Sequence, residues 1–361
     1  MGVGISYLSS QSLAASRCNF LPKAEILFLA TASDMIVGAN NLLLLAARTA
    51  SPWMAAPPAT PFAPNPPRDG GTISEPAANW AISRLLRTGV EMDTPALRTS
   101  VPTTFLRPSP SEERPIALFL HGADFSCLEW RFLLQQLCEE GVDCVAVDWY
   151  SGGWTERGQI TAALCGSDAQ PWTLVRQHLL AFWEQQLRGR PVVLIGASLG
   201  GAVAIDFAST HPEAVEKLVL IDAGGESYKA PPPDTVAAFA KPVLAVKGLF
   251  QAVQARLPDD ASRIVSLHRA EPGCYEASLA YLESGSMARR VGRERIQQVA
   301  QPTLVVWGTE DDILPLSDAY AFERDLQHCV GVREVPGSGH SPHLDQPEAV
   351  LAHLRPFVAQ R

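Results

Sequence analysis

One serine stands between glycines where two apolar runs meet, and this junction constrains the fold more than any other stretch. Residues 191–210 read PVVLIGASLGGAVAIDFAST, with Ser198 two places after Gly196 and two places before Gly200. The first run is typical of a buried strand and the second of a helix. A serine presented on a sharp strand-to-helix turn needs small neighbours, and Gly196, Gly200 and Gly201 meet that need. The junction predicts a nucleophilic serine.

From about residue 74 onward, strand-like and helix-like runs alternate along the chain. IALFLHG, VDCVAVDW, KLVLIDAG and QPTLVVWG are continuous apolar runs, and amphipathic stretches separate them. Such alternation predicts an α/β fold, a mainly parallel sheet covered by helices on both faces, with a core over 74–223 and 299–361. Near the start of this region we expect a helix over 75–90 and a pair of short strands over 94–108.

The alternation lapses over 224–298, which shows no strand signal. This stretch is too long for a plain loop in a compact domain. We expect it to form an inserted, mostly helical lid, or cap.

The first 70 residues differ from the rest of the chain. A leader rich in serine and alanine precedes an apolar run over 26–47, which Asp34, Asn40 and Asn41 interrupt, and 51–71 holds seven prolines. We expect 1–70 to be a leader and Pro-rich linker outside the fold. A transit peptide to the chloroplast or another organelle is favoured. The alternatives are a membrane anchor, which we do not expect, and a disordered extension before a true start at Met54 in a cytoplasmic protein.

Charge and cysteine content exclude several classes of protein. The formal net charge of −9 argues against a nucleic-acid partner, because phosphate binding needs a basic surface. The seven cysteines form no C-x-x-C pair, which indicates reduced thiols in a reducing compartment. We expect no metal and no cofactor.

A serine hydroxyl needs a base to accept its proton and an acid to orient that base. His340, in VPGSGHSPHLDQPE, follows the last strand-like run and is the predicted base, with His343 as its near rival. The remaining histidines beside predicted helices are expected at the surface: His178, His211, His268, His328 and His353.

The acid is expected after another strand. In LVVWGTEDDILP the strand-like run ends near Gly308, and Asp311 is the predicted acid, with Asp312 and Glu310 as alternatives. Asp222, which follows the run LVLI, occupies another place where such sheets carry an acid, although a turn cap is the favoured interpretation there.

An oxyanion hole requires two backbone donors near the nucleophile. The N–H of Leu199, directly after the serine, is one predicted donor. The other is the N–H of Ala123, in the loop after IALFLHG. His121 and Gly122 are expected to support that loop.

With these segments in place, the chain from about residue 90 onward resembles the α/β-hydrolase superfamily. The matching motifs are LFLHGAD, VDWYSGGWT, LIGASLGGAVAIDFA, WGTEDDILP and GSGHSPHLDQPE, in that order. Parts of the chain look most like uncharacterised hydrolases of plants, algae and cyanobacteria. The resemblance implies an eight-stranded type of sheet with the lid after the sixth strand. It also implies Ser198 as nucleophile, His340 as base, Asp311 as its orienting acid, and a lid that shapes the substrate pocket.

Departures from the family patterns narrow the expected function. Serine at 198 argues against epoxide hydrolases and haloalkane dehalogenases, which use aspartate there. The D-x-x-G-x-G-x-S turn of relatives has Ser151 in place of a glycine, so a looser turn is expected. Hydrolases that cleave carbon–carbon bonds usually carry a glycine-rich loop after HG and an asparagine before the serine; HGADFSC and Ala197 fit neither pattern.

The favoured function is therefore hydrolysis of carboxylic esters, with a small-molecule ester or lipid-like substrate. Two alternatives stay open. One is a carbon–carbon bond hydrolase of the same superfamily, and the other is a receptor-like protein that binds a ligand with little turnover.

Overall fold

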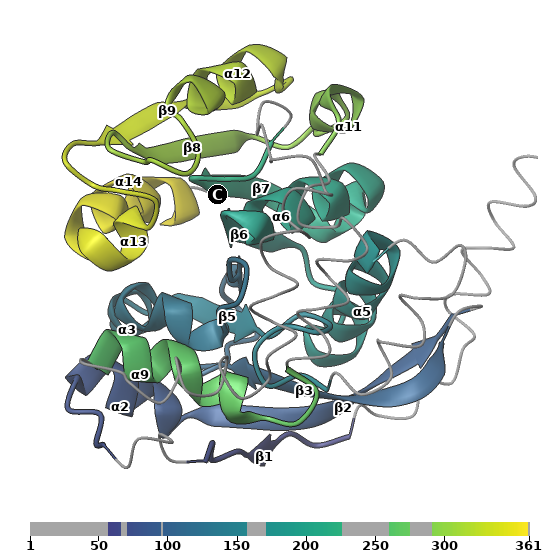
Figure 1. The fold of residues 1–361 in the computed structure, drawn as a ribbon. Helices are drawn as coiled ribbons and strands as arrows, with labels where there is room; N and C mark the ends of the chain where they lie inside the picture. The colour runs from purple at the N-terminus through teal and green to yellow at the C-terminus, as the bar shows by residue number, and fades with distance from the viewer. Residues whose placement is uncertain are drawn as a thin grey trace, which may run out of the picture. The chain divides into compact units, whose positions relative to one another are not determined.

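A sheet of order β1-β2-β3-β5-β4-β6-β7-β8-β9 runs through the fold in the computed structural model (Figure 1). The structure describes residues 57–65, 71–94, 97–156, 171–225, 260–274 and 291–359. The described strands are β1 (Thr60–Pro61), β2 (Leu85–Asp93), β3 (Arg98–Leu106), β4 (Ile116–Leu120), β5 (Asp143–Val147), β6 (Val192–Ala197), β7 (Val215–Ile221), β8 (Thr303–Gly308) and β9 (Cys329–Val335). The pairs from β5 to β9 are all parallel, and the pairs that join β1, β2, β3 and β5 are antiparallel.

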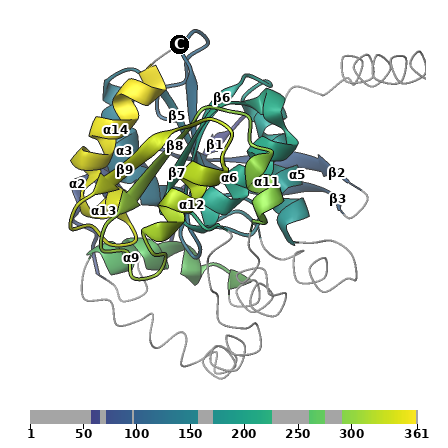
Figure 2. The ribbon, with the colours of Figure 1, turned by 90° about the horizontal axis from the view of Figure 1, so that it is seen from above.

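Helices cover both faces of this sheet, as Figure 2 shows from above. One apolar layer includes residues of α5 (Pro171–Gln186), α6 (Leu199–Thr210), α11 (Arg293–Gln297) and α12 (Ser317–Asp325). The other includes residues of α2 (Pro76–Ile82), α3 (Arg131–Glu139), α9 (Asp260–Leu267) and α14 (Pro347–Ala359). The short helices are η1 (Cys127–Trp130), η2 (Pro212–Ala214), η3 (His268–Ala270) and α13 (Pro342–Asp345).

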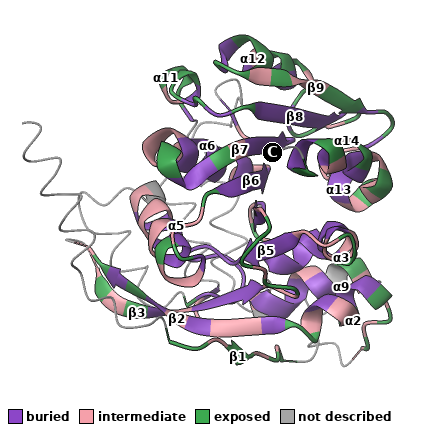
Figure 3. Ribbon diagram, turned by 180° about the vertical axis from the view of Figure 1, so that it is seen from behind, coloured by how far each residue is buried: buried purple, intermediate pink, exposed green. Residues whose placement is uncertain are grey.

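The central strands are buried on both faces, as their continuous apolar sequences require. Every residue of β4, β5, β6 and β8 is buried, whereas in β9, at the sheet edge, Val335 alone is buried and the rest are half-buried or exposed (Figure 3). Parallel strands covered by helices on both sides have no solvent-facing side. The predicted α/β fold with a mainly parallel, helix-flanked sheet is confirmed.

The sheet has one strand more than the eight-stranded type that the resemblance implies. Thr60 and Pro61, inside the range assigned to the linker, pair with Arg87 and Leu86 of β2, and the Phe62 N–H donates to the Leu85 carbonyl. Prolines can lie at the edge of a sheet, where no partner strand needs their missing N–H. Because β1 adds a strand at the start, the predicted sixth strand is β7, and the range 224–298 follows it.

The first helix is shorter than its amphipathic pattern indicates. Helix α2 ends at Ile82, and Leu85 already begins β2, so the helix expected over 75–90 is wrong in its second half. The range 94–108 contributes the single strand β3, which pairs with β2 from end to end. Pro102 lies opposite Gly89 inside this hairpin. Pairing across the hairpin overrides the local pattern.

Several sequence-based predictions fall on segments outside the described residues. The leader and the apolar run at 26–47 lie there, and so does most of the range assigned to the lid. The described parts of that range include α9, η3 and α11. Within the described residues, no helix has both the length and the apolar character needed to cross a membrane.

Candidate active site

Ser198 occupies the turn between β6 and α6 with a backbone conformation that side-chain-bearing residues rarely adopt. Its φ is 50° and its ψ is −120°. The Ser198 N–H donates to the Ile221 carbonyl at 3.0 Å, and the Ser198 carbonyl accepts from the N–H of Gly201 and Gly224 at 3.0 and 2.9 Å. These three hydrogen bonds hold the backbone of Ser198 in its strained conformation. Such strain persists only where the surrounding structure imposes it.

Two glycines make this turn sterically possible. A Cβ at Gly196 would lie 2.4 Å from the Gly200 carbonyl oxygen, and a Cβ at Gly200 would lie 2.2 Å from the carbonyl oxygen of Leu120. Backbone atoms cannot move aside at such distances, so strand, turn and helix approach this closely only with glycine at both positions. Gly201 packs closely against Ala223: a Cβ at Gly201 would lie 2.4 Å from the Ala223 Cβ.

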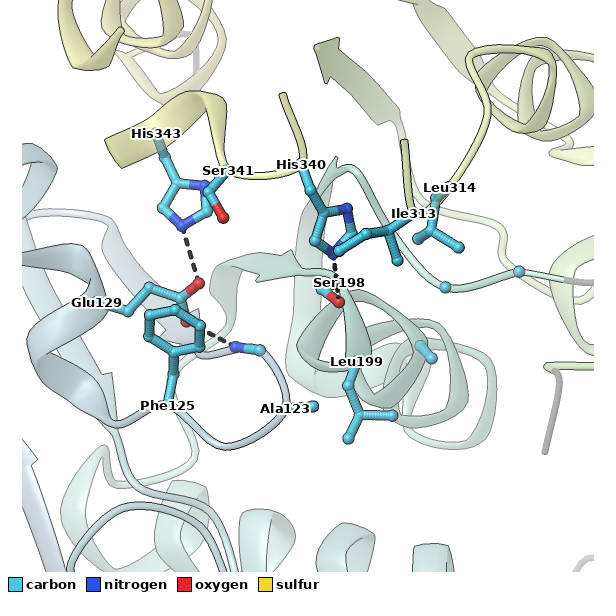
Figure 4. A pocket seen from close by; sticks show the side chains of 14 residues that line it. Ala123, Phe125, Glu129, Ser198, Leu199, Ile313, Leu314, His340, Ser341 and His343 are labelled. Atoms are coloured by element: carbon cyan, nitrogen blue, oxygen red, sulfur yellow. Dashed lines mark hydrogen bonds and ion pairs between the residues drawn. The ribbon is translucent and has the colours of Figure 1, made fainter. Parts of the chain in front are cut away.

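Ser198, His340 and Asp311 form an uninterrupted chain of hydrogen bonds. His340 Nε2 lies 2.9 Å from Ser198 Oγ, and His340 Nδ1 lies 2.8 Å from Asp311 Oδ2 (Figure 4 shows the first contact). The three residues come from the ends of β6, β8 and β9, which are brought together because parallel strands end at the same edge of the sheet. The structure brings together the three residues predicted from the sequence.

Asp311 is held as an anion. Its side chain is fully buried, and this opposes ionisation. The hydrogen bond from His340 and the backbone N–H groups of Leu314 and Ile313 outweigh burial and lower the pKa of Asp311 below its ordinary value. The alternative acids Glu310 and Asp312 are exposed.

Asp222, the other candidate acid, lies beside this chain of bonds, but its carboxyl is protonated and neutral. Its Oδ1 accepts from the Gly308 N–H at 3.0 Å, and its Oδ2 has no hydrogen-bond partner among the described residues. Burial, which outweighs the Gly308 bond and is reinforced by Asp311, raises the pKa of Asp222 to about 9. The carboxyl of Asp222 is therefore neutral at pH 7, and Asp311 is the partner of His340.

Both predicted oxyanion donors border the same cavity as Ser198. Ala123 follows β4 and Leu199 is the first residue of α6, and each lines the cavity. Within the described residues, neither backbone N–H donates to a protein acceptor. The first N–H groups of a helix have no intrahelical acceptor, and they carry partial positive charge.

The loop that carries Ala123 is supported by buried side chains. His121 is buried, its Nδ1 lies 2.8 Å from the Gly122 carbonyl, and its ring stacks on Trp149 at 4.8 Å. Asp148 accepts from the N–H of Cys127 at 2.6 Å and from that of Trp154 at 2.8 Å.

The turn after β5 is closed, contrary to the looser turn expected there. Ser151 itself takes a φ of 77°, the left-handed conformation that glycine usually provides. The Gly152 N–H donates to the Trp149 carbonyl at 2.8 Å, and the Thr155 N–H donates to the Gly152 carbonyl at 3.1 Å. The substituted residue bears the strain, and the turn keeps its hydrogen bonds.

A second histidine–carboxylate pair borders the cavity, and its acid, Glu129, is not among the residues predicted from the sequence. His343, the rival candidate base, places its Nε2 2.9 Å from Glu129 Oε1, and Glu129 Oε2 accepts from the Gly122 N–H at 2.6 Å (Figure 4). His343 therefore faces Glu129 and not Ser198. The signal that could have found Glu129 is a charged residue flanked by Leu128 and Trp130, inside a run otherwise expected to be buried.

The described residues around Ser198 enclose a cavity of about 310 Å³. Its apolar lining comes mainly from Phe125, Leu199, Ala202, Ile313 and Leu314. The polar side chains that line it are those of Glu129, Ser198, His340, Ser341 and His343.

One group of side chains could hold a metal ion by distance alone. The ligand atoms of Asp222, Asp311 and His340 lie within 4.8 Å of one another. Both ring nitrogens of His340 are already hydrogen-bonded, however, to Asp311 and to Ser198. An ion there would have to displace one of those bonds.

Two histidines expected at the surface are buried. His178 is fully buried on α5, its Nε2 lies 2.7 Å from Thr103 Oγ1, and burial lowers its pKa to about 3. His268 is 1% exposed in η3. The helical pattern did not reveal which face of each helix is buried. The five cysteines among the described residues are free: Cys127, Cys138, Cys144, Cys274 and Cys329.

The fold, the strained serine turn and the order of the site residues along the chain define an α/β hydrolase. The family model described as "Alpha/beta hydrolase family" matches residues 117–353. The chain belongs to this family of hydrolases.

Curated relatives are similar over much of the chain. The "Alpha/beta hydrolase domain-containing protein VTE7" of Arabidopsis thaliana is 29% identical over 310 residues, which cover 81% of this chain and 89% of that protein. A "Pimeloyl-[acyl-carrier protein] methyl ester esterase" of Aromatoleum aromaticum is 32% identical over 210 residues, 52% of this chain and 82% of that protein.

Solved structures share the fold. A membrane phospholipase A has a TM-score of 0.60 at 20% identity, over 92% of this chain and 96% of that one. A thermophilic esterase from Thermogutta terrifontis has a TM-score of 0.58 at 20% identity, over 75% of this chain and 97% of that one. At these identities the likeness supports the architecture alone.

Proposed function

We propose that the chain is a serine hydrolase of carboxylic esters that works through an acyl-enzyme. The observation that carries this proposal is the chain of hydrogen bonds from Asp311 through His340 to Ser198, at 2.8 and 2.9 Å, at a cavity of about 310 Å³. A nucleophile joined to a base, with the base joined to an orienting acid, is the arrangement that activates a hydroxyl at neutral pH.

In the proposed reaction, Ser198 Oγ attacks the ester carbonyl while His340 Nε2 accepts the hydroxyl proton. The carbonyl oxygen becomes negative, and the N–H groups of Leu199 and Ala123 stabilise it. His340 then donates its proton to the departing alcohol, which leaves an acyl group on Ser198. Water, deprotonated by His340, releases the acid and restores the free serine.

The two buried carboxyls beside His340 suit this cycle because they differ in charge. Asp311, with its lowered pKa, is an anion that holds the Nδ1–H tautomer and stabilises the imidazolium formed during each proton transfer. Asp222, with its raised pKa, stays neutral at pH 7. The imidazolium therefore faces one negative charge.

The lining of the cavity supports a substrate with an apolar part. Phe125, Leu199 and Leu314 offer apolar surface next to Ser198, and burial of such surface favours binding by about 25 cal/mol per Å². We propose a small-molecule ester with an apolar or lipid-like chain. The proposed lid over 224–298 would complete this pocket.

Turnover of p-nitrophenyl esters of rising acyl length by the full chain tests the proposal. We expect hydrolysis by the wild type and its loss in Ser198→Ala. Ser341→Ala is the matched control, because it removes a hydroxyl from the wall of the same cavity without touching the chain of bonds. Turnover that persists unchanged in Ser198→Ala would overturn the proposal.

Two further measurements on the same proteins separate the two alternatives left open by the sequence. Acylation of Ser198 without turnover would favour a receptor-like binding protein. Turnover of a ring-cleavage product, with esters left intact, would favour carbon–carbon bond hydrolysis.

For the cellular location we propose import into a plastid or another organelle, supported by the Ser/Ala-rich leader and the plant relative. Attachment to a membrane through 26–47 is the weaker proposal. Fusion of residues 1–70 to a fluorescent protein tests both, since import moves the fusion into the organelle lumen and anchoring leaves it in the membrane fraction.

A further inference from the structure

Glu129 is a buried carboxylate whose two oxygens bind two different segments of the candidate active site. The residue is 3% exposed, its Oε2 accepts from the Gly122 N–H at 2.6 Å, and its Oε1 contacts His343 Nε2 at 2.9 Å. Removing a carboxylate from water is costly unless its oxygens are hydrogen-bonded. Both oxygens of Glu129 are engaged in this way, so the carboxylate serves as a fixed link between the two segments.

The first segment is the loop that carries the proposed oxyanion donor Ala123. Gly122, directly before Ala123, has the rotational freedom of glycine, so the direction of the Ala123 N–H depends on what anchors the loop. Glu129 anchors the loop at Gly122, and Asp148 anchors it at the Cys127 N–H. The peptide between them is therefore positioned by two buried carboxylates.

The second segment carries the proposed base. His343 lies three residues after His340, in the short helix α13, and it is 1% exposed. Its ring also stacks on Trp130, the neighbour of Glu129, at 4.7 Å with an interplanar angle of 28°. The pair Glu129–Trp130 thus binds His343 both through a hydrogen bond and through ring contact.

We propose that Glu129 is a positioning residue, which holds the Ala123 loop and the His340 segment in a fixed relation through Gly122 and His343. The proposal rests on the proposed ester hydrolysis. Glu129 touches no reacting atom in this scheme. Its loss displaces the oxyanion donor and the base from the places where the transition state needs them, and leaves ground-state binding in the apolar cavity nearly intact.

Three variants of the full chain test this positioning. Glu129→Ala removes both contacts, and His343→Phe removes one while retaining an aromatic ring for Trp130. Glu129→Gln keeps both contacts, because its amide oxygen accepts from Gly122 and its amide nitrogen donates to the His343 ring. The matched control is Asp143→Ala, a fully buried carboxylate that binds Arg107 at the opposite ends of the strands.

The first readout is steady-state hydrolysis of a p-nitrophenyl ester, with binding of an alkyl boronic acid that forms a tetrahedral adduct on the serine. Loss of one oxyanion donor costs roughly 100- to 1,000-fold in kcat, and a displaced donor costs less. We expect Glu129→Ala to lower kcat and boronate affinity by roughly 30- to 100-fold with KM within about threefold. Glu129→Gln should stay within about fivefold of the wild type, and His343→Phe should fall between the two.

The second readout is amide hydrogen exchange, which needs no activity. Glu129→Ala should expose both 122–127 and 340–345 to faster exchange, and Asp143→Ala should leave these segments protected. If Glu129→Ala does not fold, the comparison of His343→Phe with Glu129→Gln decides in the same way.

Two results would overturn the positioning role. One is a folded Glu129→Ala, or a folded His343→Phe, with wild-type kcat and boronate affinity. The other is an equal loss in Glu129→Ala and Asp143→Ala, which would mark a general structural effect. A different result would mark failure of the proposed function alone. In that case the wild type neither hydrolyses esters nor binds boronate, while Glu129→Ala and Asp143→Ala still show the exchange expected of them.

Discussion

His340 and His343 lie three residues apart in the sequence and line one cavity, and each contacts a carboxylate, yet their second ring nitrogens meet different surroundings. His340 contacts Asp311 at 2.8 Å through Nδ1, and its Nε2 faces Ser198 Oγ. His343 contacts Glu129 at 2.9 Å through Nε2, and its Nδ1 has no hydrogen-bond partner among the described residues. The His340 side chain is 17% exposed, whereas that of His343 is 1% exposed.

This difference shows that an acid beside a histidine does not by itself define a base. A base also needs a proton donor on its other nitrogen and a route to solvent or substrate. His340 has both. His343 is closed in by Trp130 and Glu129, and we propose that its carboxylate contact holds two segments of the chain together.

Replacement of the two histidines, one at a time, should have very different effects on turnover. His340→Ala should lower kcat by roughly 10⁴- to 10⁶-fold, because the proposed nucleophile loses its base. His343→Ala should lower it by no more than about 100-fold, because it removes only a positioning contact. Ester turnover by both variants, checked for folding by circular dichroism, measures the contrast; equal losses would refute the distinction between the pairs.

The next effect concerns the acids of the first pair. Asp311→Asn should lower kcat by roughly 10³- to 10⁴-fold, since an amide can hold His340 in the wrong tautomer and cannot stabilise its imidazolium. Asp312→Asn is the matched control, because Asp312 is exposed next to Asp311. If Asp312→Asn alone impaired turnover, the assignment of the acid would be wrong.

A smaller effect concerns the neutral carboxyl next to the first pair. The pKa of Asp222 is raised to about 9 in the folded chain, so between about pH 4 and 9 the unfolded chain ionises this group and the folded chain does not. Its contribution to the free energy of unfolding therefore falls as pH rises through that window. Asp222→Asn should stabilise the protein at pH 8 by roughly 4 kcal/mol more than at pH 5, at about 1.4 kcal/mol per pH unit, as urea unfolding would measure. An equal change at both pH values would show that Asp222 is ionised in the folded protein.

The smallest effect expected is on the pH dependence of stability, and it comes from a buried histidine that contacts a hydroxyl and not a carboxylate. His178 lies against Thr103, and burial lowers its pKa to about 3. The unfolded chain binds a proton below about pH 6.5 and the folded chain does not, so stability falls as pH drops from about 6.5 towards 3. His178→Gln should reduce this pH-dependent loss by roughly 2 kcal/mol between pH 7 and 5. A loss of the same size in the variant would assign it to other groups.

The sequence was informative where local pattern and chemistry agree. The apolar run, the serine and the glycines around 191–210 share one steric requirement, so the turn at Ser198 could be predicted residue by residue. Asp311 and His340 could also be placed, since each follows a strand-like run and parallel strands end at one edge.

The remaining features depend on contacts between residues far apart in the chain. Glu129 meets Gly122 and His343 only after η1 and α13 pack together, and no local spacing reports that contact. Strand β1 pairs with β2 across a proline-rich stretch, and β2 replaces the second half of an apparently amphipathic helix. In each case tertiary pairing overrides local propensity.

Labelling of the full chain by a fluorophosphonate, with the modified peptide located by mass spectrometry, shows whether Ser198 is an activated nucleophile. We expect stoichiometric modification at Ser198, abolished in Ser198→Ala and slowed by orders of magnitude in His340→Ala. His343→Ala should still be labelled at Ser198. A folded wild type that resists the probe, or one labelled equally fast without His340, would contradict the account.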